Sequence, residues 1–508
     1  MQFEAYYFVI FIINDFNIMT TEVKERVDRI MEYCHNQADI YNNFQLGTKV
    51  VINGIYGAFG FSGFYFYNPN IAESVTKQGK NAIKYAEKLT DMYFQKKWHL
   101  DEKTHNLMGI HMKPGAKVTK SVCVYQDTDS QYSSFQEVIP TTDWFEHKVW
   151  RLTTINKSND QKDFVYVSSG RYKTEESAKE YFKVDEINTD KYLWSIDTIE
   201  PGGREFSLTF DRVFLHDFFV MIFDKYAEKN CTPNILNFEL EAYNEAGIWL
   251  AKKKYIKNTT WTEPNVYYES CEKIKPTGVE IAQTSSSPWV KKQMTDLIKW
   301  IFRQETFTLD GFCKELIKVK KSFMQQSEEI ISLNKGMNKY DDYVMGDTTE
   351  IELHAQPMVT VQGAAFYNWL LNNNERFKRK YNTLVNADKL CVLYIKPTPR
   401  YTYWKECNLT PAEYAKNRDK YRIIDDTKVV KTNASGNTVT LYKLAEEKCL
   451  VEAFSYPAGQ FPREITTGFE IDYEHMFELL ILQPMNRIVE AMGFQPINID
   501  MTYEASLW

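Results

Sequence analysis

The hydrophobic and polar positions of the chain follow two periods. Apolar residues that recur every three or four positions predict helices, at 23–44, 49–59, 71–95, 214–226, 290–304, 310–331, 363–381 and 473–492. Short alternating runs predict strands, at 121–125, 131–135, 149–154, 164–168, 192–199, 205–210, 251–257, 392–396 and 438–444. Helices mixed with short neighbouring strands are typical of an α+β fold, in which an antiparallel sheet is backed by helices.

Several elements come with an expected packing. Residues 23–44, capped by Thr21, and 49–59 are expected to form a helical pair. Its apolar positions are expected to be packed, and they are Val27, Ile30, Met31, Tyr33, Val50, Val51, Ile52 and Ile55. The helix at 71–95 has a candidate core face of Ala72, Val75, Ala82, Ala86, Leu89 and Tyr93, with Ile83 at its margin. Residues 95–120 are interpreted as a polar loop, and 140–212 as a small β-rich insertion without evident chemistry.

Composition narrows the class of protein. A length of 508 residues implies about two to four domains. A hydrophobic share of 44%, with 15% aromatic residues, indicates a globular chain. None of the eight cysteines forms a C-x-x-C pair, which argues against a zinc ribbon or a disulfide framework and favours free thiols in a reducing cytosol. The net charge of −7 means that a nucleic-acid cleft would need a local basic field.

The N-terminal apolar run does not indicate that the chain binds or crosses a membrane. Ala5–Ile13 spans nine residues, too few to cross a bilayer, and it lacks the basic leader and cleavage site of a signal peptide. It is either a strand that packs on another segment or an artefact of a gene break, with translation starting at Met19.

A carboxylate pair interrupts the two strands expected at 121–135. Asp127 and Asp129 are separated by Thr128, and Asp, Thr and Ser favour tight turns. The two carboxylates are then expected at the tip of a hairpin, where their repulsion favours a cation between them. Mg²⁺ takes such oxygen ligands together with substrate phosphates. The alternative, a solvated Asx turn, is the commoner meaning of an isolated D-T-D.

A second candidate strip lies upstream. Lys49, Asn53 and Tyr56 are spaced i, i+4, i+7, so they share one face of a helix. Such a strip can hold a triphosphate and order a sugar or a base, although an ordinary half-exposed helix has the same pattern. Gly54 and Gly57 weaken the helix and suit the close approach of another chain.

Together these stretches resemble family B DNA polymerases. The fingers motif K-x-x-x-N-S-x-Y-G corresponds to Lys49–Gly57, with Gly54 in place of Ser, and the palm motif Y-x-D-T-D-S corresponds to Tyr125–Ser130. Further similarities follow in order, and several are typical of the tailed-bacteriophage branch. They are the K-K-x-Y motif at 252–255, the palm-to-thumb junction at 275–280 and 284–288, and the end of the thumb at 462–465, 472–473 and 483–484.

The resemblance implies a right-hand polymerase. Its expected parts are an N-terminal segment (1–21), partial helical fingers (22–60), a palm (61–139 and 213–283) interrupted by the β-rich insertion (140–212), and a mostly helical thumb (284–508). The implied reaction is template-directed nucleotidyl transfer from a dNTP to primer–template DNA, with two Mg²⁺ ions. The implied catalytic and metal residues are Asp127 and Asp129, the nucleotide-binding residues are Lys49, Asn53 and Tyr56, and the DNA-binding residues are Gly57, Thr128, Lys252, Lys253, Lys254, Tyr255, Thr277 and Gly278.

Two basic segments are candidates for contact with the DNA backbone. If 251–257 is a strand, Lys252 and Lys254 face one way and Lys253 and Tyr255 the other. Lys would then bind phosphates, whereas the alternative is a solvated edge strand guarded by Lys. The basic segment Arg376–Tyr381 either follows the duplex backbone or forms a solvated helix face.

One family motif is absent. The first palm motif, D-x-x-S-L-Y-P, supplies another metal-binding aspartate, and neither it nor the exonuclease acids occur in these 508 residues. The expected protein is therefore the C-terminal half of a split bacteriophage polymerase. It would work in the cytoplasm of an infected bacterium and be inactive without an N-terminal partner. The alternative is a non-catalytic DNA-binding remnant. The abbreviated ending at 505–508 gives little support to sliding-clamp binding.

Overall fold

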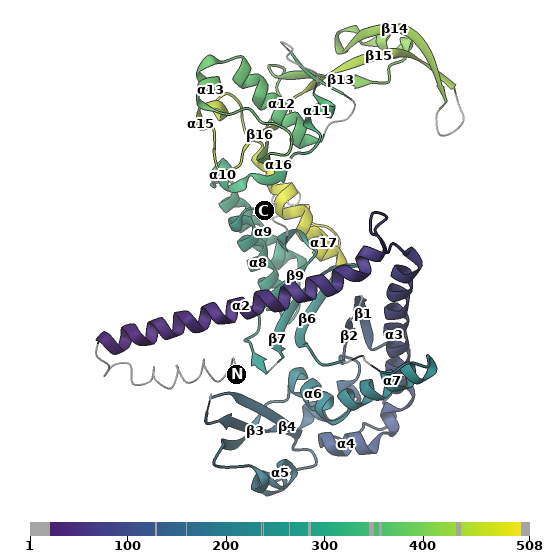
Figure 1. Cartoon of the computed structure of the whole chain (residues 1–508), viewed down its shortest axis with the longest axis vertical. Helices are drawn as coiled ribbons and strands as arrows, with labels where there is room; N and C mark the ends of the chain where they lie inside the picture. Colours follow the sequence, from purple (N-terminus) through teal and green to yellow (C-terminus); the bar gives the residue numbers. More distant parts are fainter. Residues whose placement is uncertain are drawn as a thin grey trace. The chain divides into compact units, whose positions relative to one another are not determined.

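The computed structural model describes residues 21–498, except 128, 129, 159, 235, 237, 264, 283–285, 345–349, 355–357 and 433–437. The chain divides into two compact units (Figure 1). Unit 1 comprises Met1–Ala246 and Asn258–Lys273, and unit 2 comprises Gly247–Lys257 and Ile274–Trp508. Helices and sheets are mixed, as in an α+β fold, while the assignment to palm, fingers and thumb stays a prediction. The apolar run at 5–13 lies outside the described residues.

Unit 1 begins with one long helix rather than the expected pair. α2 runs from Thr21 to Phe59 without a break. Gly47 costs only about 1 kcal/mol in a helix interior, and the Thr48 hydroxyl donates a hydrogen bond to the Phe44 carbonyl at 2.9 Å within the helix. The sequence between the two expected helices therefore contains nothing strong enough to end the first.

The expected packing of α2 is also wrong. Val50, Val51 and Ile55 are 62%, 65% and 53% exposed, and Ile30 and Tyr33 are exposed as well. An apolar pattern predicts a helix, but it does not determine that the structure supplies a covering surface.

The next helix, α3 (Pro69–Lys96), follows an aromatic turn at 60–68. The Asn68 side chain caps it by accepting from the backbone amides of Asn70 and Ile71. The expected core positions Ala82, Ala86 and Tyr93 are buried. Ile83 is also buried, with 8% of its surface exposed, whereas Val75 is 50% exposed, contrary to expectation.

The segment 95–120 is not simply a polar loop. It contains η1 (Trp98–Leu100) and α4 (Glu102–Met108), and Trp98 and Met108 are 0% exposed. The Asp101 side chain caps α4 by accepting from the Thr104 amide at 3.1 Å. A few large apolar residues within a polar segment are thus enough to anchor it.

The segment expected to be a β-rich insertion contains a three-stranded antiparallel sheet. β3 (Val149–Asn156) pairs with β4 (Lys162–Ser168) and β5 (Tyr192–Ile199), in the order β4-β3-β5. The short helices around it are η2 (Ile139–Thr141), η3 (Trp144–Glu146), α5 (Glu175–Phe182) and η4 (Val184–Glu186).

The strand expected at 205–210 is wrong. This segment is α6 (Gly203–Phe210), which continues through the π-helical η5 (Asp211–Leu215) into α7 (His216–Lys229). Phe206, Phe210 and Phe214 recur every four residues, a helical spacing, and the first two are completely buried. They meet Phe94, Trp98 and Trp144 in the aromatic core of unit 1.

A further sheet is formed by β6 (Ala242–Ala251), β7 (Lys254–Thr262), β8 (Val266–Tyr267) and β9 (Lys273–Thr277). In this sheet β7 pairs with β6, β8 and β9. η6 (Glu280–Ala282) follows β9.

Unit 2 contains two sheets besides its helices. β10 (Leu333–Gly336), β12 (Lys389–Tyr394) and β16 (Ala453–Pro457) form one sheet. β11 (Ile351–Leu353), β13 (Thr402–Cys407), β15 (Thr438–Leu450) and β14 (Tyr421–Thr432) form the other, in that order. The strands expected at 392–396 and 438–444 are confirmed.

The helices of unit 2 agree with the pattern but are more divided. α8 (Pro288–Phe302) has Ser287 as its cap. Residues 310–331 are split into α9 (Leu309–Phe323) and α10 (Glu328–Ile331), and residues 363–381 into α12 (Val359–Asn372) and α13 (Glu375–Lys380), which Asn374 caps. Shorter helices are α11 (Tyr340–Tyr343), α14 (Pro411–Lys416), η7 (Arg418–Lys420) and α15 (Arg463–Thr466).

Residues 473–492 are helical almost throughout, as expected. α16 (Tyr473–Phe477), the π-helical η8 (Glu478–Leu482) and α17 (Gln483–Ala491) follow one another. All eight cysteines are unpaired in the structure. Within the described ranges, no helix has the length and apolar character needed to cross a membrane.

Candidate active site and nucleic-acid contacts

Asp127, the first carboxylate of the predicted pair, lies at the end of a hairpin, as the sequence predicts. β1 (Cys123–Asp127) and β2 (Ser130–Ser133) are antiparallel, and Asp127 pairs with Ser130. Asp127 is half-buried, and the Ser130 hydroxyl donates to its carbonyl at 3.3 Å. Thr128 and Asp129 lie outside the described residues. We call this element the carboxylate hairpin.

Helix α3 holds the carboxylate hairpin in place. The two Asp91 carboxylate oxygens accept from the Val122 amide at 2.9 Å and the Ser121 hydroxyl at 2.7 Å. The Gln126 side-chain amide, next to Asp127, donates to the Ile83 carbonyl at 3.2 Å. Sequence analysis missed both positioning residues, because an Asp on a helix and a Gln in a strand have many other uses.

The hairpin is irregular at the end farther from its tip. Its register shifts between Cys123 and Tyr125, which pair with Ser133 and Tyr132, and the Tyr125 and Tyr132 rings face each other at 5.7 Å. Bulges twist a strand and occur often beside active sites, where they redirect a side chain.

The surroundings of β1 are electronegative. Burial, together with the nearby carboxylates of Glu87 and Asp91, raises the pKa of the Cys123 thiol to about 12. Such a field favours a cation near the hairpin. The oxygen donors of Asp127 and Asp129 suit Mg²⁺. Among the residues that the structure describes, however, no group of three or more His, Cys, Asp or Glu is placed to hold a metal ion.

The predicted nucleotide strip lies on α2. Positions 49, 53 and 56 are helical, as expected, but the side chains of Lys49, Asn53 and Tyr56 lie outside what the structure describes. Gly57 is exposed. A Cβ built on Gly54 or Gly57 would meet no atom within 4 Å outside the helix backbone around it. The space that these glycines leave is therefore open.

The strand expected at 251–257 is confirmed only from Lys254 onward, where β7 begins, and the first two lysines of the motif lie in a hairpin turn. β6 ends at Ala251 and β7 begins at Lys254, so Lys252 and Lys253 form the turn. Lys253 has a left-handed backbone with φ of 61°. All three lysines are exposed, and they do not alternate between faces, because alternation requires a continuous strand. We call residues 252–254 the lysine tip.

Two predicted DNA-binding motifs meet in unit 2. Gly278 follows Thr277, the last residue of β9, and has a φ of +65°. A Cβ on Gly278 would lie 1.9 Å from the Lys253 carbonyl oxygen, so only glycine permits this approach. Gly278 therefore supports the lysine tip, a role that the sequence alone did not reveal.

Tyr255 lies beneath the lysine tip and is only 8% exposed. Lys257 places its ammonium 5.5 Å from the centre of this ring. Burial of Tyr255 fits a role in supporting the tip, while direct contact with DNA stays a prediction.

The basic segment Arg376–Tyr381 forms α13 and the residue after it. Arg376, Lys378 and Arg379 are exposed, and Lys380 pairs with Glu464 at 2.7 Å. Tyr381 is 7% exposed and anchors the segment to the core. Both alternatives, a DNA contact and a solvated face, remain open.

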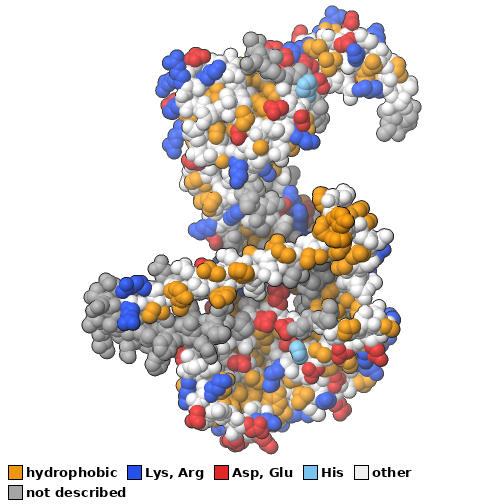
Figure 2. Space-filling model, in the orientation of Figure 1, with side chains coloured by type: hydrophobic (Ala, Val, Ile, Leu, Met, Phe, Trp, Pro, Cys, Tyr) orange, Lys and Arg blue, Asp and Glu red, His pale blue; other side chains and the backbone are white. Residues whose placement is uncertain are grey.

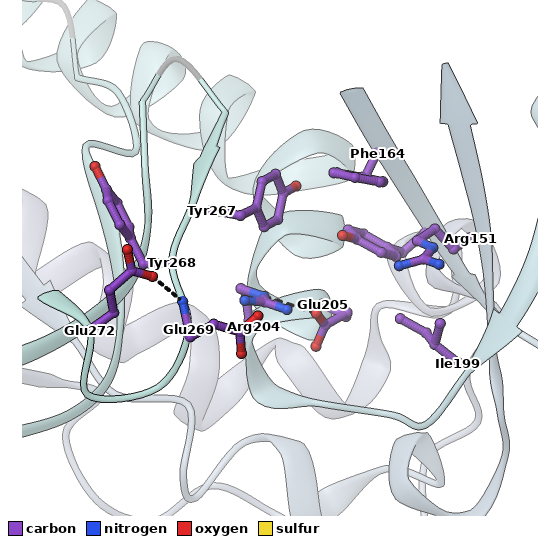
Figure 3. A pocket seen from close by; sticks show the side chains of 10 residues that line it. Arg151, Phe164, Ile199, Arg204, Glu205, Tyr267, Tyr268, Glu269 and Glu272 are labelled. Carbon is purple, nitrogen blue, oxygen red and sulfur yellow. Dashed lines mark hydrogen bonds and ion pairs between the residues drawn. The ribbon is translucent and has the colours of Figure 1, made fainter. Parts of the chain in front are cut away.

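A cavity of about 310 Å³ lies in unit 1, where the β3–β5 sheet approaches α6 and β8 (Figure 3). It is lined by Arg151, Phe164, Tyr166, Ile199, Arg204, Glu205, Tyr267, Tyr268, Glu269 and Glu272. Arg151 pairs with Asp197 and Arg204 with Glu205, at 2.9 Å in each case. Because both guanidinium groups already have carboxylate partners, the cavity fits a junction between elements better than an anion site.

Comparison with known proteins places the carboxylate hairpin within a matched region. A family model described as DNA polymerase family B matches residues 13–142. This range covers α2, α3 and both strands of the carboxylate hairpin. Residues 13–142 are thus similar to family B DNA polymerases.

Individual relatives extend the similarity. The DNA-directed DNA polymerase of Enterobacteria phage T4 is 23% identical over 331 residues, which are 64% of this chain and 30% of the relative. The DNA polymerase of Phaeocystis pouchetii virus is 33% identical over 103 residues, 20% of this chain and 9% of the relative. DNA polymerase 1 of Sulfolobus acidocaldarius is 39% identical over 82 residues, which are 15% of this chain and 9% of the relative. The chain thus spans less than a third of the length of these relatives.

Proposed function

We propose that the chain is a subunit of a DNA-directed DNA polymerase and contributes its fingers helix, palm hairpin and DNA-contacting thumb side. The observation that supports this most is the D-T-D sequence at the end of the carboxylate hairpin, within the range that matches family B polymerases. A pure DNA-binding protein has no need of a close carboxylate pair, because paired carboxylates repel phosphates as well as each other.

The proposed chemistry assigns a role to each candidate residue. Asp129 ligates metal directly, and Asp127 assists by ligation or through its charge. Two Mg²⁺ ions, when bound, activate the primer 3′-hydroxyl and stabilise the leaving pyrophosphate. Lys49 neutralises the dNTP triphosphate, Asn53 orders the nucleotide, and Tyr56 with Gly57 lies against the nascent base pair.

The lysine tip holds the primer–template by its backbone. Lys252, Lys253 and Lys254 are exposed, and lysines that contact phosphates supply affinity without reading sequence. Thr277 and Gly278 hold the tip in shape, and Thr128 contacts DNA beside the carboxylates.

The proposal includes a partner. Another polypeptide supplies the D-x-x-S-L-Y-P aspartate and the exonuclease, so this chain alone does not synthesise DNA. The T4 relative, of which the match covers 30%, supports a larger functional whole. A phage polymerase of this kind would act in the cytoplasm of an infected bacterium.

Primer extension tests this function. The chain, alone and mixed with the polypeptide from the same genome that contains D-x-x-S-L-Y-P, is given primer–template, dNTPs and Mg²⁺. Asp129→Ala is the test variant and Asp426→Asn, at an exposed position on β14, is the control. We expect synthesis only in the mixture, lost with Asp129→Ala and kept with Asp426→Asn. Duplex binding without synthesis in any mixture would instead support a non-catalytic remnant.

A further inference from the structure

The cavity of unit 1 contains none of the residues proposed for metal, dNTP or DNA. Its lining residues lie within 151–205 and 267–272, which belong to the same unit. They also lie beyond residue 142, where the match to family B polymerases ends. The volume of about 310 Å³ is at the lower end of the range for small-molecule sites, about 300–1,000 Å³. The cavity is therefore large enough for one ring system.

Glu205 supplies the cavity with a buried acceptor. Its side chain is almost completely buried, and the residue is 6% exposed. Oε1 of its carboxylate accepts from Arg204 Nε at 2.9 Å, whereas no described residue donates to Oε2. A Cβ on Gly202 would collide with Oε2, so glycine at 202 is what permits this position of the carboxylate. A buried carboxylate oxygen without a donor is costly, and a ligand with N–H groups would satisfy it.

Two arginines place donors in the same cavity. Arg204 uses Nε for Glu205 and Nη1 for the Thr260 carbonyl at 3.5 Å, and its Nη2 has no described acceptor. Arg151 is held by Asp197 through Nε and Nη2, which leaves its Nη1 without a described acceptor. The lining therefore presents N–H donors as well as the Glu205 acceptor.

Aromatic rings form a wall of the cavity. The rings of Phe164 and Tyr166 are nearly parallel, with an interplanar angle of 19°, and the Tyr267 ring meets Phe164 edge-on at 4.8 Å. Figure 3 shows Phe164 and Tyr267 in the same cavity as the joined Arg204–Glu205 pair. Flat π faces favour a planar ligand that stacks or meets them edge-on.

The charges favour a neutral ligand. Guanidinium groups already lie over Phe164 and Tyr267, at 5.5 and 5.3 Å from the ring centres, so a further cation would be repelled. Glu269 and Glu272, which also line the cavity, are exposed. Acidic residues outnumber basic ones in unit 1, and Figure 2 shows acidic side chains in red on its visible face. An anion is therefore disfavoured as well.

We propose that this cavity binds a single nucleobase, with guanine preferred. The Watson–Crick edge of guanine has two adjacent N–H donors beside a carbonyl acceptor. The Glu205 carboxylate accepts from the two donors, Arg204 donates to the carbonyl, and the aromatic wall contacts the ring. Hydrogen bonds to the edge of a base combined with aromatic contacts to its faces are the usual way in which proteins hold an unpaired base.

The test measures nucleoside binding in the absence of Mg²⁺, so that a metal-dependent dNTP site does not contribute. The full chain is titrated with guanosine and with adenosine by isothermal titration calorimetry. Glu205→Gln is the first test variant, and Ile199→Phe, which fills the cavity without altering Glu205, is the second. Glu176→Gln, at an exposed position on α5, is the control. Circular dichroism checks the folding of each variant.

We expect guanosine to bind the wild type at least tenfold more tightly than adenosine. Glu205→Gln should raise the Kd for guanosine roughly thirtyfold, as for the loss of one base-edge contact. Its amide offers a donor and an acceptor, which match adenine, so the preference for guanosine should also fall. Ile199→Phe should abolish binding, and Glu176→Gln should leave it unchanged. Equal affinity for the two nucleosides, or wild-type affinity in folded Glu205→Gln, would overturn the inference.

A competition experiment identifies the source of the base. Bound guanosine is challenged with a single-stranded oligonucleotide of thymines, with or without one central guanine. Displacement only by the strand that contains guanine would assign the cavity to an unpaired base of a nucleic acid. Displacement by neither strand would assign it to a free nucleoside. Equal displacement by both strands would contradict the preference for guanine.

Discussion

Two hairpins of the chain have tips of opposite charge. The carboxylate hairpin of unit 1 ends at Asp127, and the β6–β7 hairpin ends in three exposed lysines in unit 2. α3 fixes the first, because its Asp91 side chain accepts from Ser121 and Val122 and its Ile83 carbonyl accepts from Gln126 of the hairpin. The second rests on the backbone of Gly278, which lies against the Lys253 carbonyl.

This difference in structural support matches the function proposed for each hairpin. Metal chemistry needs carboxylates held to a fraction of an ångström, so several directed hydrogen bonds brace that hairpin. Contact with a phosphate backbone tolerates movement, because a lysine acts as a point charge on a flexible stem. Substitutions should therefore separate the two: one hairpin controls the rate of the chemical step and the other controls DNA affinity.

The largest expected effect comes from the carboxylate hairpin. Asp127→Asn removes a charge that we propose assists metal binding, and it should slow nucleotide addition by the complemented protein roughly a thousandfold, as for other electrostatic stabilisers. The dissociation constant for DNA should change little. Steady-state primer extension measures the rate, and a gel-shift titration measures DNA affinity. An equal loss in affinity and rate would contradict separate roles for the two hairpins.

Gly278→Ala should disturb the lysine tip by a steric route. The new Cβ would lie against the Lys253 carbonyl at a positive φ, so we expect a loss of about 2 kcal/mol in the free energy of unfolding. DNA affinity should fall as well. Gly459→Ala is the control, because it has a positive φ of +86° but open space. Urea unfolding that shows equal losses for the two variants would argue against a specific contact.

Lys252→Ala should weaken DNA binding about tenfold at moderate salt and reduce the slope of log Kd against log salt by about 1. Lys428→Ala, an exposed lysine on β14, should have no such effect. Fluorescence anisotropy at several salt concentrations gives the slope. An unchanged slope would show that the tip does not touch phosphate.

The smallest expected effect concerns the brace of the carboxylate hairpin. Asp91→Asn removes one of the charges that raise the Cys123 pKa, so this pKa should fall and alkylation of Cys123 at pH 9 should accelerate. The unfolding free energy should drop by about 1 kcal/mol. Mass-spectrometric mapping follows Cys123 with the exposed Cys231 as an internal control. A Cys123 rate that does not change would mean that burial alone protects it.

The sequence predicted local elements better than packing. The period-two runs located β1–β5, since alternation on a half-buried strand is a strong signal. At 205–210, Phe206 and Phe210 suggested alternation but are one helical turn apart and buried on the same side. The pattern within a short segment does not distinguish a strand from a helix. Here the aromatic side chains of α3 and η1 that pack against Phe210 favour the helix.

The candidate site shows the same limit. Motifs identified Asp127 and the lysine tip, because chemistry restricts residue type and spacing. The sequence did not predict that Asp91, Ile83 and Gly278 support the two hairpins. Their contact partners are distant in sequence, and the residue type alone does not reveal such contacts. The exposure of Val51 and Ile55 was likewise hidden, because a hydrophobic pattern does not say what covers it.

The most direct measurement is single-turnover addition of one nucleotide, by rapid quench, with DNA varied to saturation. It compares the complemented wild type, Asp127→Asn and Lys252→Ala. The account predicts that the Asp127 variant remains slow at saturating DNA, whereas the Lys252 variant reaches the wild-type rate but needs more DNA to do so. Addition by the Asp127 variant at the wild-type rate would contradict the assignment of the carboxylate hairpin to catalysis.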